Sequence, residues 1–191
     1  MILIIDNGSQ YTHLIKRNCR DLGFEAMIFN NSKQFSEIKN IIKNAEKIIL
    51  SGGPSSVNAG NLGLSEEIVK KINVERIEMP ILGVCFGHQL FAHLLGGNVE
   101  KGESAEYGIC EIDVDSEDVL FKGVPKKFNA WVSHFDTVKI MPKDFVSLAH
   151  SKTCAHEAMR HETRNIFGVQ FHPEVWHTEH GEKILANFLK I

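Results

Sequence analysis

The stretch EMPILGVCFGHQLFAHLLGG, residues 78–97, decides the fold. Residues 80–84 form an uninterrupted apolar run, which is typical of a strand buried on both faces of a parallel sheet. Leucines and a phenylalanine then recur at helical spacing until a glycine pair ends the pattern. Cys85 therefore lies at a sharp turn from strand to helix, and the small neighbours Gly83 and Gly87 let the chain turn without a clash.

Such a turn is expected to hold Cys85 in a tight, exposed conformation. The helix N-terminus just behind the cysteine favours negative charge, so it stabilises the thiolate over the thiol. A typical cytosolic cysteine is more often a small buried apolar residue. The glycine-flanked turn favours a nucleophile instead, provided that a base lies elsewhere in the chain.

The rest of the chain predicts a single-domain α/β fold over residues 1–191. In the first half, apolar runs alternate with amphipathic helical patterns, which predicts a mostly parallel open sheet with helices on both faces. Ligands bind such sheets at the C-terminal ends of the strands, so Cys85 and residues 51–54 are expected to face the same crevice. The predicted strands are residues 1–5, 24–29, 47–50 and 80–84, and the predicted helices between them begin near residues 10, 35 and 64.

After Gly97 the pattern changes. Short β-rich runs separated by turn residues predict an antiparallel extension of the sheet, followed by one more apolar strand and a final helix for which Thr178 is the expected N-cap. The predicted runs are residues 99–101, 108–114, 128–132 and 145–150, then the strand 165–171 and the helix 179–189.

Composition excludes several classes of protein. The chain is 43% apolar and 24% charged, and its formal charge of -3 with scattered basic residues argues against nucleic-acid binding. No apolar run approaches the roughly 18–20 residues that span a bilayer, and the N-terminal MILIIDNG has no basic region of a signal peptide. The four cysteines show no disulfide spacing, which indicates a reducing compartment. We therefore expect a cytoplasmic protein that contacts no membrane.

A cysteine nucleophile needs a base, and the base needs an orienting partner. Among the ten histidines, His172 stands out because it ends an apolar strand and Pro173 fixes the backbone after it. If the segment is extended, the side chains of His172 and Glu174 share a face, so the carboxylate can hold one imidazole nitrogen while the other faces Cys85. An isolated His-Pro-Glu on a solvated loop is the alternative. The histidine spacings match no metal-ligand pattern, so no metal site is expected.

The motifs GVCFGHQ (residues 83–89) and GVQFHPE (168–174) together closely resemble the signatures of class I glutamine amidotransferases, which have a flavodoxin-like fold. The resemblance implies Cys85 as nucleophile, His172 as base and Glu174 as the residue that orients it. It further implies an oxyanion hole from the backbone amides of Gly53 and Phe86. It also implies that the substrate glutamine is bound by Gln89, Ser133, Phe135 and Asp136, the last three in a loop that acts largely through its backbone.

Within this family, the segments DNGSQY (residues 6–11), AEYG (105–108) and SHFDTV (133–138) resemble the GMP synthase branch. Nothing follows the final helix here, so the match is to a separate glutaminase subunit. The resemblance then implies a partner, the ATP-pyrophosphatase subunit of GMP synthase, which would aminate XMP. ATP and Mg²⁺ would be used by that partner, and no cofactor is expected in this chain, which has no P-loop motif.

Two other functions stay open at this stage. The chain could be another cysteine hydrolase of similar fold, such as a γ-glutamyl peptidase or the glutaminase of a different synthase. It could also be a non-catalytic binding module that has kept the fold, although the complete set of Cys85, His172 and Glu174 argues against this.

Overall fold

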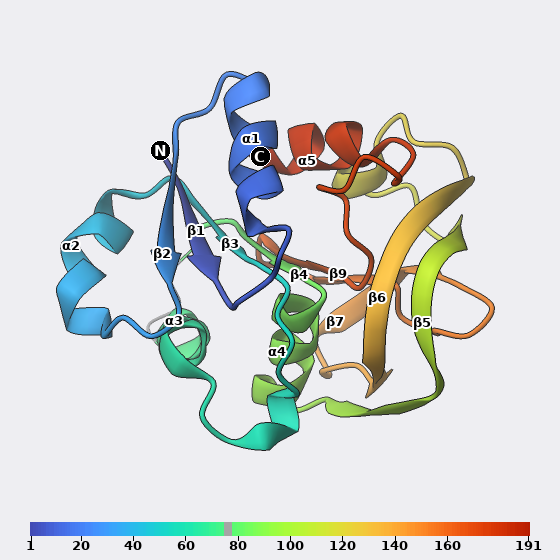
Figure 1. Ribbon diagram of the computed structural model, residues 1–191, viewed down its shortest axis with the longest axis horizontal. Coiled ribbons are helices and arrows are strands. Elements are labelled where there is room, and N and C mark those ends of the chain that lie inside the picture. Colours follow the sequence, from blue (N-terminus) through green and yellow to red (C-terminus); the bar gives the residue numbers. More distant parts are fainter. Residues whose placement is uncertain (75–77) are drawn as a thin grey trace.

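The computed structural model describes residues 1–74 and 78–191, with Glu103 described by its backbone alone (Figure 1). Strands and helices alternate through the first half, as predicted. The elements there are β1 (Ile2–Asp6), α1 (Thr12–Asp21), β2 (Ala26–Asn30), α2 (Phe35–Asn44), β3 (Lys47–Leu50), the 3₁₀ turn η1 (Val57–Ala59), α3 (Gly63–Val74), β4 (Ile81–Val84) and α4 (Phe86–Leu94).

The second half is rich in strands. It contains β5 (Asn98–Val114), the 3₁₀ turn η2 (Val119–Phe121), β6 (Lys127–Ile140), β7 (Phe145–His150), β8 (Ala158–His161), β9 (Ile166–Val169) and the final helix α5 (Gly181–Leu189). Within the described residues these strands join the earlier ones in one nine-stranded sheet of order β2-β1-β3-β4-β9-β8-β7-β5-β6.

The sheet has a parallel and an antiparallel half. Strands β2, β1, β3, β4 and β9 pair in parallel, whereas β8, β7, β5 and β6 continue the sheet with antiparallel pairings. Figure 1 shows the two long strands β5 and β6 at the far edge from β2. The predicted fold class, a mostly parallel open sheet with an antiparallel extension, is confirmed.

Helices cover both faces of the parallel half, and β1 illustrates why. Ile2 and Ile4 pack into a cluster with residues of α1 and α5, while Leu3 and Ile5 pack into a second cluster with residues of α2, α3 and α4. Side chains alternate between the two faces of a strand, so an uninterrupted apolar run buries both faces. These four side chains are fully buried, and burying each contributes roughly 1.5–3 kcal/mol relative to leaving it in water.

Four details differ from the predictions. The two runs predicted at residues 99–101 and 108–114 belong to one strand, β5, whose pairing with β6 shifts register between Lys101 and Glu106. Strand β8 was not predicted, and residues 133–136 lie inside β6 rather than in a loop. Helix α5 begins at Gly181 after His180, which adopts the left-handed conformation, so the prediction of Thr178 as its N-cap is wrong.

The topology brings two distant segments together. β4 and β9 are parallel neighbours, with Val84 opposite Val169, and the backbone amide of Cys85 donates to the carbonyl of Val169 at 2.8 Å. The residues that follow both strands therefore emerge at the same edge of the sheet. Among the described residues, no helix combines the length and apolar character needed to cross a bilayer.

Candidate active site

Cys85 lies at the turn between β4 and α4 with a strained backbone. Its φ of 50° and ψ of −101° lie in a region that residues with a side chain rarely adopt. The flanking glycines make the turn possible. A Cβ on Gly83 would lie 2.4 Å from the backbone of Gly87, and one on Gly87 would lie 2.6 Å from the carbonyl oxygen of Leu50. The predicted strand-to-helix turn is therefore present, with Cys85 immediately before the first residue of α4.

Cys85 is less exposed than expected, because only 5% of its surface is accessible. It contributes to the lining of a cavity of about 300 Å³. The lining residues are Gly8, Ser9, Gln10, Tyr11, Gly53, Pro54, Cys85, Ser133 and His172. The cavity therefore combines the segment after β1, the segment after β3, the turn after β4, the middle of β6 and the segment after β9.

His172 and Glu174 meet as predicted, although the backbone between them is not extended. Nδ1 of His172 lies 2.8 Å from Oε1 of Glu174, and both residues are buried. The segment is a turn in which the amide of Val175 donates to the carbonyl of His172 at 3.4 Å. The expectation of an extended segment is therefore wrong, and a turn produces the contact instead.

Contacts from β6 hold His172 in place. The amide of His172 donates to the carbonyl of Trp131 at 2.9 Å. The hydroxyl of Thr178 donates to the carbonyl of His172 at 2.6 Å and accepts from the amide of Trp131 at 2.9 Å. Thr178 thus fixes the backbone of the predicted base against β6, which is the role it has in place of capping α5.

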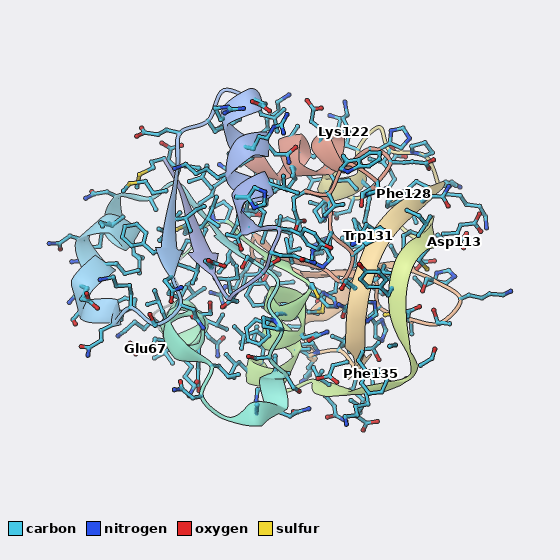
Figure 2. The ribbon with its side chains drawn as sticks, in the orientation of Figure 1. Glu67, Asp113, Lys122, Phe128, Trp131 and Phe135 are labelled. Atoms are coloured by element: carbon cyan, nitrogen blue, oxygen red, sulfur yellow. The ribbon has the colours of Figure 1, made fainter. Side chains whose placement is uncertain are left out.

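Tyr11 packs its ring edge-on to the imidazole of His172, with the ring centroids 5.1 Å apart. The indole of Trp131, labelled in Figure 2, donates to the hydroxyl of Tyr11 at 3.2 Å. Sequence reasoning assigned Tyr11 no role beyond marking a branch of the family. Tyr11 follows the first strand, so it lies at the same edge of the sheet as Cys85. This position is the signal that could have identified it as a residue of the site.

The electrostatics favour a charged imidazole. Burial alone would lower the pKa of His172, but the Glu174 carboxylate and the hydrogen-bonded sulfur of Cys85 outweigh it and raise this pKa well above its ordinary value. A cysteine whose imidazole neighbour is readily protonated can exist as a thiolate–imidazolium pair, which is the reactive form of a cysteine nucleophile.

The predicted oxyanion donors come from the residue after Cys85 and from the loop after β3. Phe86 is the first residue of α4, so its amide is one of those that no helical carbonyl satisfies. The loop after β3 lies close to the ring of His172, since a Cβ on Gly52 would be 3.0 Å from Cε1 of His172. Gly53 lines the cavity and packs tightly on Asn7, whose carbonyl oxygen would be 2.5 Å from a Cβ at that position.

The predicted glutamine-binding residues are only partly brought together. Ser133 lines the cavity, and its carbonyl accepts from Sγ of Cys85 at 3.8 Å. Gln89 is buried, and its amide nitrogen donates to the carbonyl of Asp136 at 2.7 Å and to Oε1 of Gln170 at 3.1 Å. The carboxylate of Asp136 accepts from the Ser56 hydroxyl at 2.5 Å. The side chains of Gln89 and Asp136 are therefore already hydrogen-bonded to other groups of the protein.

Phe135 lies apart from the cavity. It is 43% exposed on β6, with the Lys101 ammonium 5.6 Å from its ring centroid, and it is labelled near the end of that strand in Figure 2. Neither Phe135 nor Gln89, Asp136 or Phe86 lines the cavity.

A larger hollow of about 850 Å³ lies between α1 and α5. Its lining includes Glu174 and Trp176 but neither Cys85 nor His172. Because no candidate nucleophile faces this hollow, the smaller cavity at Cys85 is the candidate site for chemistry.

Known proteins resemble this chain over its whole length. Residues 3–191 match the family model described as glutamine amidotransferase class-I. Curated relatives named as a subunit of glutamine-hydrolyzing GMP synthase include one from Pyrococcus abyssi, 51% identical over 100% of this chain and 98% of that protein. Another, from Methanocaldococcus jannaschii, is 48% identical over 100% of this chain and 97% of that protein.

Solved structures agree on the fold. A protein from Thermoplasma acidophilum superposes with a TM-score of 0.87 and 34% identity, covering 99% of this chain and 92% of that one. A glutamine amidotransferase from Thermotoga maritima superposes with a TM-score of 0.78 and 21% identity, covering 91% of this chain and 76% of that one. With a family model spanning nearly every residue and close relatives matched from end to end, the chain belongs to the class-I glutamine amidotransferases.

Proposed function

We propose that this chain is the glutaminase subunit of a GMP synthase, which hydrolyses glutamine to glutamate and ammonia. One observation carries the chemical part of this proposal. Cys85 and His172 line the same small cavity, and Nδ1 of His172 lies 2.8 Å from the carboxylate of Glu174. The full-length similarity to proteins named as a subunit of glutamine-hydrolyzing GMP synthase supports the biological part.

The proposed reaction begins with attack of the Cys85 thiolate on the side-chain carbonyl carbon of glutamine. The carbonyl oxygen becomes an oxyanion, for which the amides of Gly53 and Phe86 are the proposed donors. An amide is a poor electrophile, and one such donor is typically worth about 2.7–4 kcal/mol of barrier. The imidazolium of His172 gives its proton to the amide nitrogen, and the carbon–nitrogen bond breaks. Ammonia is released, and a γ-glutamyl thioester remains on Cys85.

Water then completes the cycle. Neutral His172 removes a proton from the water molecule, and the resulting hydroxide attacks the thioester carbon. The carbon–sulfur bond breaks, which releases glutamate and restores the thiolate of Cys85. Glu174 holds Nδ1 of His172 throughout, so that Nε2 is the nitrogen that exchanges protons. Each turnover consumes one glutamine and one water molecule and yields one glutamate and one ammonia.

The ammonia is proposed to pass to a separate ATP-pyrophosphatase subunit of GMP synthase, which converts XMP to GMP. ATP and Mg²⁺ would act in that partner, so the proposed glutaminase reaction needs no cofactor in this chain. We further propose that the complex is cytoplasmic, where the four cysteines of this chain would stay reduced.

The test is glutamate production by the purified chain, alone and with a GMP synthase ATP-pyrophosphatase subunit, ATP and XMP. We expect slow hydrolysis by the chain alone and faster hydrolysis, coupled to GMP formation, with the partner. Cys85→Ala should abolish glutamate release in both states. An equal rate with and without partner and XMP would refute the coupling, and glutamate release by Cys85→Ala would refute the proposed nucleophile.

A further inference from the structure

Three side chains outside the Cys85 cavity form a mostly buried cluster. Glu106 lies on β5, His134 on β6, and Glu157 just before β8. One nitrogen or oxygen atom from each residue can be chosen so that all three lie within 4.8 Å of one another. Nε2 of His134 lies 3.1 Å from Oε2 of Glu106. Because the three residues come from separate elements, no local spacing in the sequence predicts this cluster.

The cluster is poorly satisfied by the protein itself. Glu157 is fully buried, and neither of its carboxylate oxygens has a hydrogen-bond partner among the described residues. Nε2 of His134 and Oε2 of Glu106 have only each other, at 3.1 Å, and Nδ1 of His134 has no hydrogen-bond partner. Oε1 of Glu106 accepts a hydrogen bond from the hydroxyl of Thr153. Buried polar groups in folded proteins nearly always have partners, so this group of unpaired atoms calls for a ligand.

Charge points to the kind of ligand. Two carboxylates brought together away from water repel each other, and one imidazole can neutralise only one of them. A cation between them would remove the repulsion and occupy the unpaired oxygens and the ring nitrogen together. We propose that Glu106, His134 and Glu157 bind one divalent transition-metal ion.

The donor set suits such an ion. Zinc binds imidazole nitrogen and carboxylate oxygen at about 2.0–2.2 Å, and a tetrahedral shell of such bonds separates neighbouring donors by about 3.4 Å. Donor atoms within 4.8 Å of one another therefore need only small side-chain movements to close around the ion. The Thr153 hydroxyl on Glu106 would help to orient that carboxylate, as hydrogen bonds to metal ligands commonly do.

The surroundings suggest a structural role. A hollow of about 510 Å³ is lined in part by residues 150–156, which include Thr153, the residue whose hydroxyl contacts Glu106. A bound ion would tie together β5, β6 and the connection from β7 to β8. His134 directly follows Ser133, whose carbonyl faces the sulfur of Cys85. The ion would therefore stabilise β6 where that strand lines the catalytic cavity, without touching the substrate.

The test is zinc binding by the full chain carrying Cys85→Ser. This background is needed because Cys85, His172 and Glu174 also carry donor types that bind zinc. After treatment with a chelator, the protein is dialysed against Zn²⁺ and the bound metal is determined. We expect one zinc ion per chain. Adding Glu157→Gln or His134→Asn should weaken binding at least about 10–100-fold.

His150→Asn is the matched control, because His150 also lies 2.8 Å from a carboxylate, that of Asp115, but at an exposed position. It should leave zinc binding unchanged. X-ray absorption of the zinc-loaded parent gives a second measurement that does not depend on the folding of any variant. It should show only nitrogen and oxygen near 2.0–2.2 Å, whereas sulfur at about 2.3 Å would mean cysteine ligands.

Three results would overturn the proposal. They are no stoichiometric zinc in the parent, sulfur in its coordination shell, or equal affinity in the parent and in a folded Glu157→Gln variant. Thermal unfolding with and without Zn²⁺ identifies the folded variants. It should also show zinc stabilising the parent but not Glu157→Gln.

Discussion

Replacing Glu174 by glutamine isolates the electrostatic part of the proposed mechanism. The change keeps the shape of the side chain but removes the negative charge 2.8 Å from Nδ1 of His172. In the native protein, burial lowers the pKa of His172, while the Glu174 carboxylate and Cys85 raise it more strongly. Without the carboxylate, burial has less opposition, so the pKa of His172 falls and the imidazolium becomes scarcer at a given pH.

The size of the effect follows from the bond that is lost. A hydrogen bond to a charged group contributes about 1.5–3 kcal/mol, and each 1.36 kcal/mol of barrier is a factor of ten in rate. Because both residues are buried, little solvent screening reduces this contribution. We expect glutamate release to fall about 10- to 150-fold near pH 7.

The pH profile adds a signature that a general loss of structure would not produce. The imidazolium of His172 must donate a proton to the leaving nitrogen, so activity is lost as pH rises through the raised pKa. Glu174→Gln should therefore move the basic limb of the profile to lower pH. Alkylation of Cys85 by iodoacetamide, measured without glutamine, should also be slower in Glu174→Gln than in the parent, because less imidazolium is present to stabilise the thiolate.

Glu179→Gln is the matched control. Glu179 belongs to the same segment, but it is solvent-exposed and accepts a hydrogen bond from the amide of Asn129 at 2.8 Å rather than from His172. It should leave both profiles unchanged. A Glu174→Gln protein that folds normally, keeps its rate within about twofold and keeps its basic limb in place would show that Glu174 does not stabilise the imidazolium.

Three further substitutions probe how the site is built. Thr178→Val removes the hydroxyl that bridges His172 and Trp131, so we expect a loss of about 1–3 kcal/mol in the free energy of unfolding, measured with urea, and a lower kcat. Tyr11→Phe loses only the hydrogen bond from the indole of Trp131 and keeps its ring against His172, so stability should fall by about 0.5–1.5 kcal/mol with kcat nearly intact. Gly83→Ala places a Cβ 2.4 Å from backbone at the start of α4, so we expect insoluble or unfolded protein in expression trials and circular dichroism.

Sequence reasoning succeeded where the cause of the structure is local. The turn at Cys85 needs glycine on both sides because backbone approaches within van der Waals contact there, and the sequence displays those glycines directly. The neighbouring strands β4 and β9 both read as uninterrupted apolar runs, because each is buried on both faces. The prediction that Cys85 and His172 converge follows from these two facts and the rule that ligands bind at strand ends.

It failed where a residue is fixed by a distant partner. Thr178 before an apolar helical pattern resembles an N-cap, but its hydroxyl serves β6 and His172 instead. Strand β8 was missed because its four residues, AMRH, show neither alternation nor an apolar run. Its pairing with β7 and β9 is visible only in the folded chain. The hydrogen bonds from the amide nitrogen of Gln89 to Asp136 and Gln170 are likewise visible only in the folded chain.

Strand β6 is the element through which the rest of the molecule can act on the candidate site. Its carbonyl at Trp131 holds the backbone of His172, its carbonyl at Ser133 faces Cys85, and its carbonyl at Asp136 holds Gln89. Cys85 and His172 owe their proximity to β4 and β9, which lie inside the sheet, whereas β6 is an edge strand. An edge strand is easier to displace than an interior one, because it pairs with only one neighbouring strand, here β5. A partner or a metal ion that stabilises β6 would therefore align the reacting groups without changing the fold that brings them together.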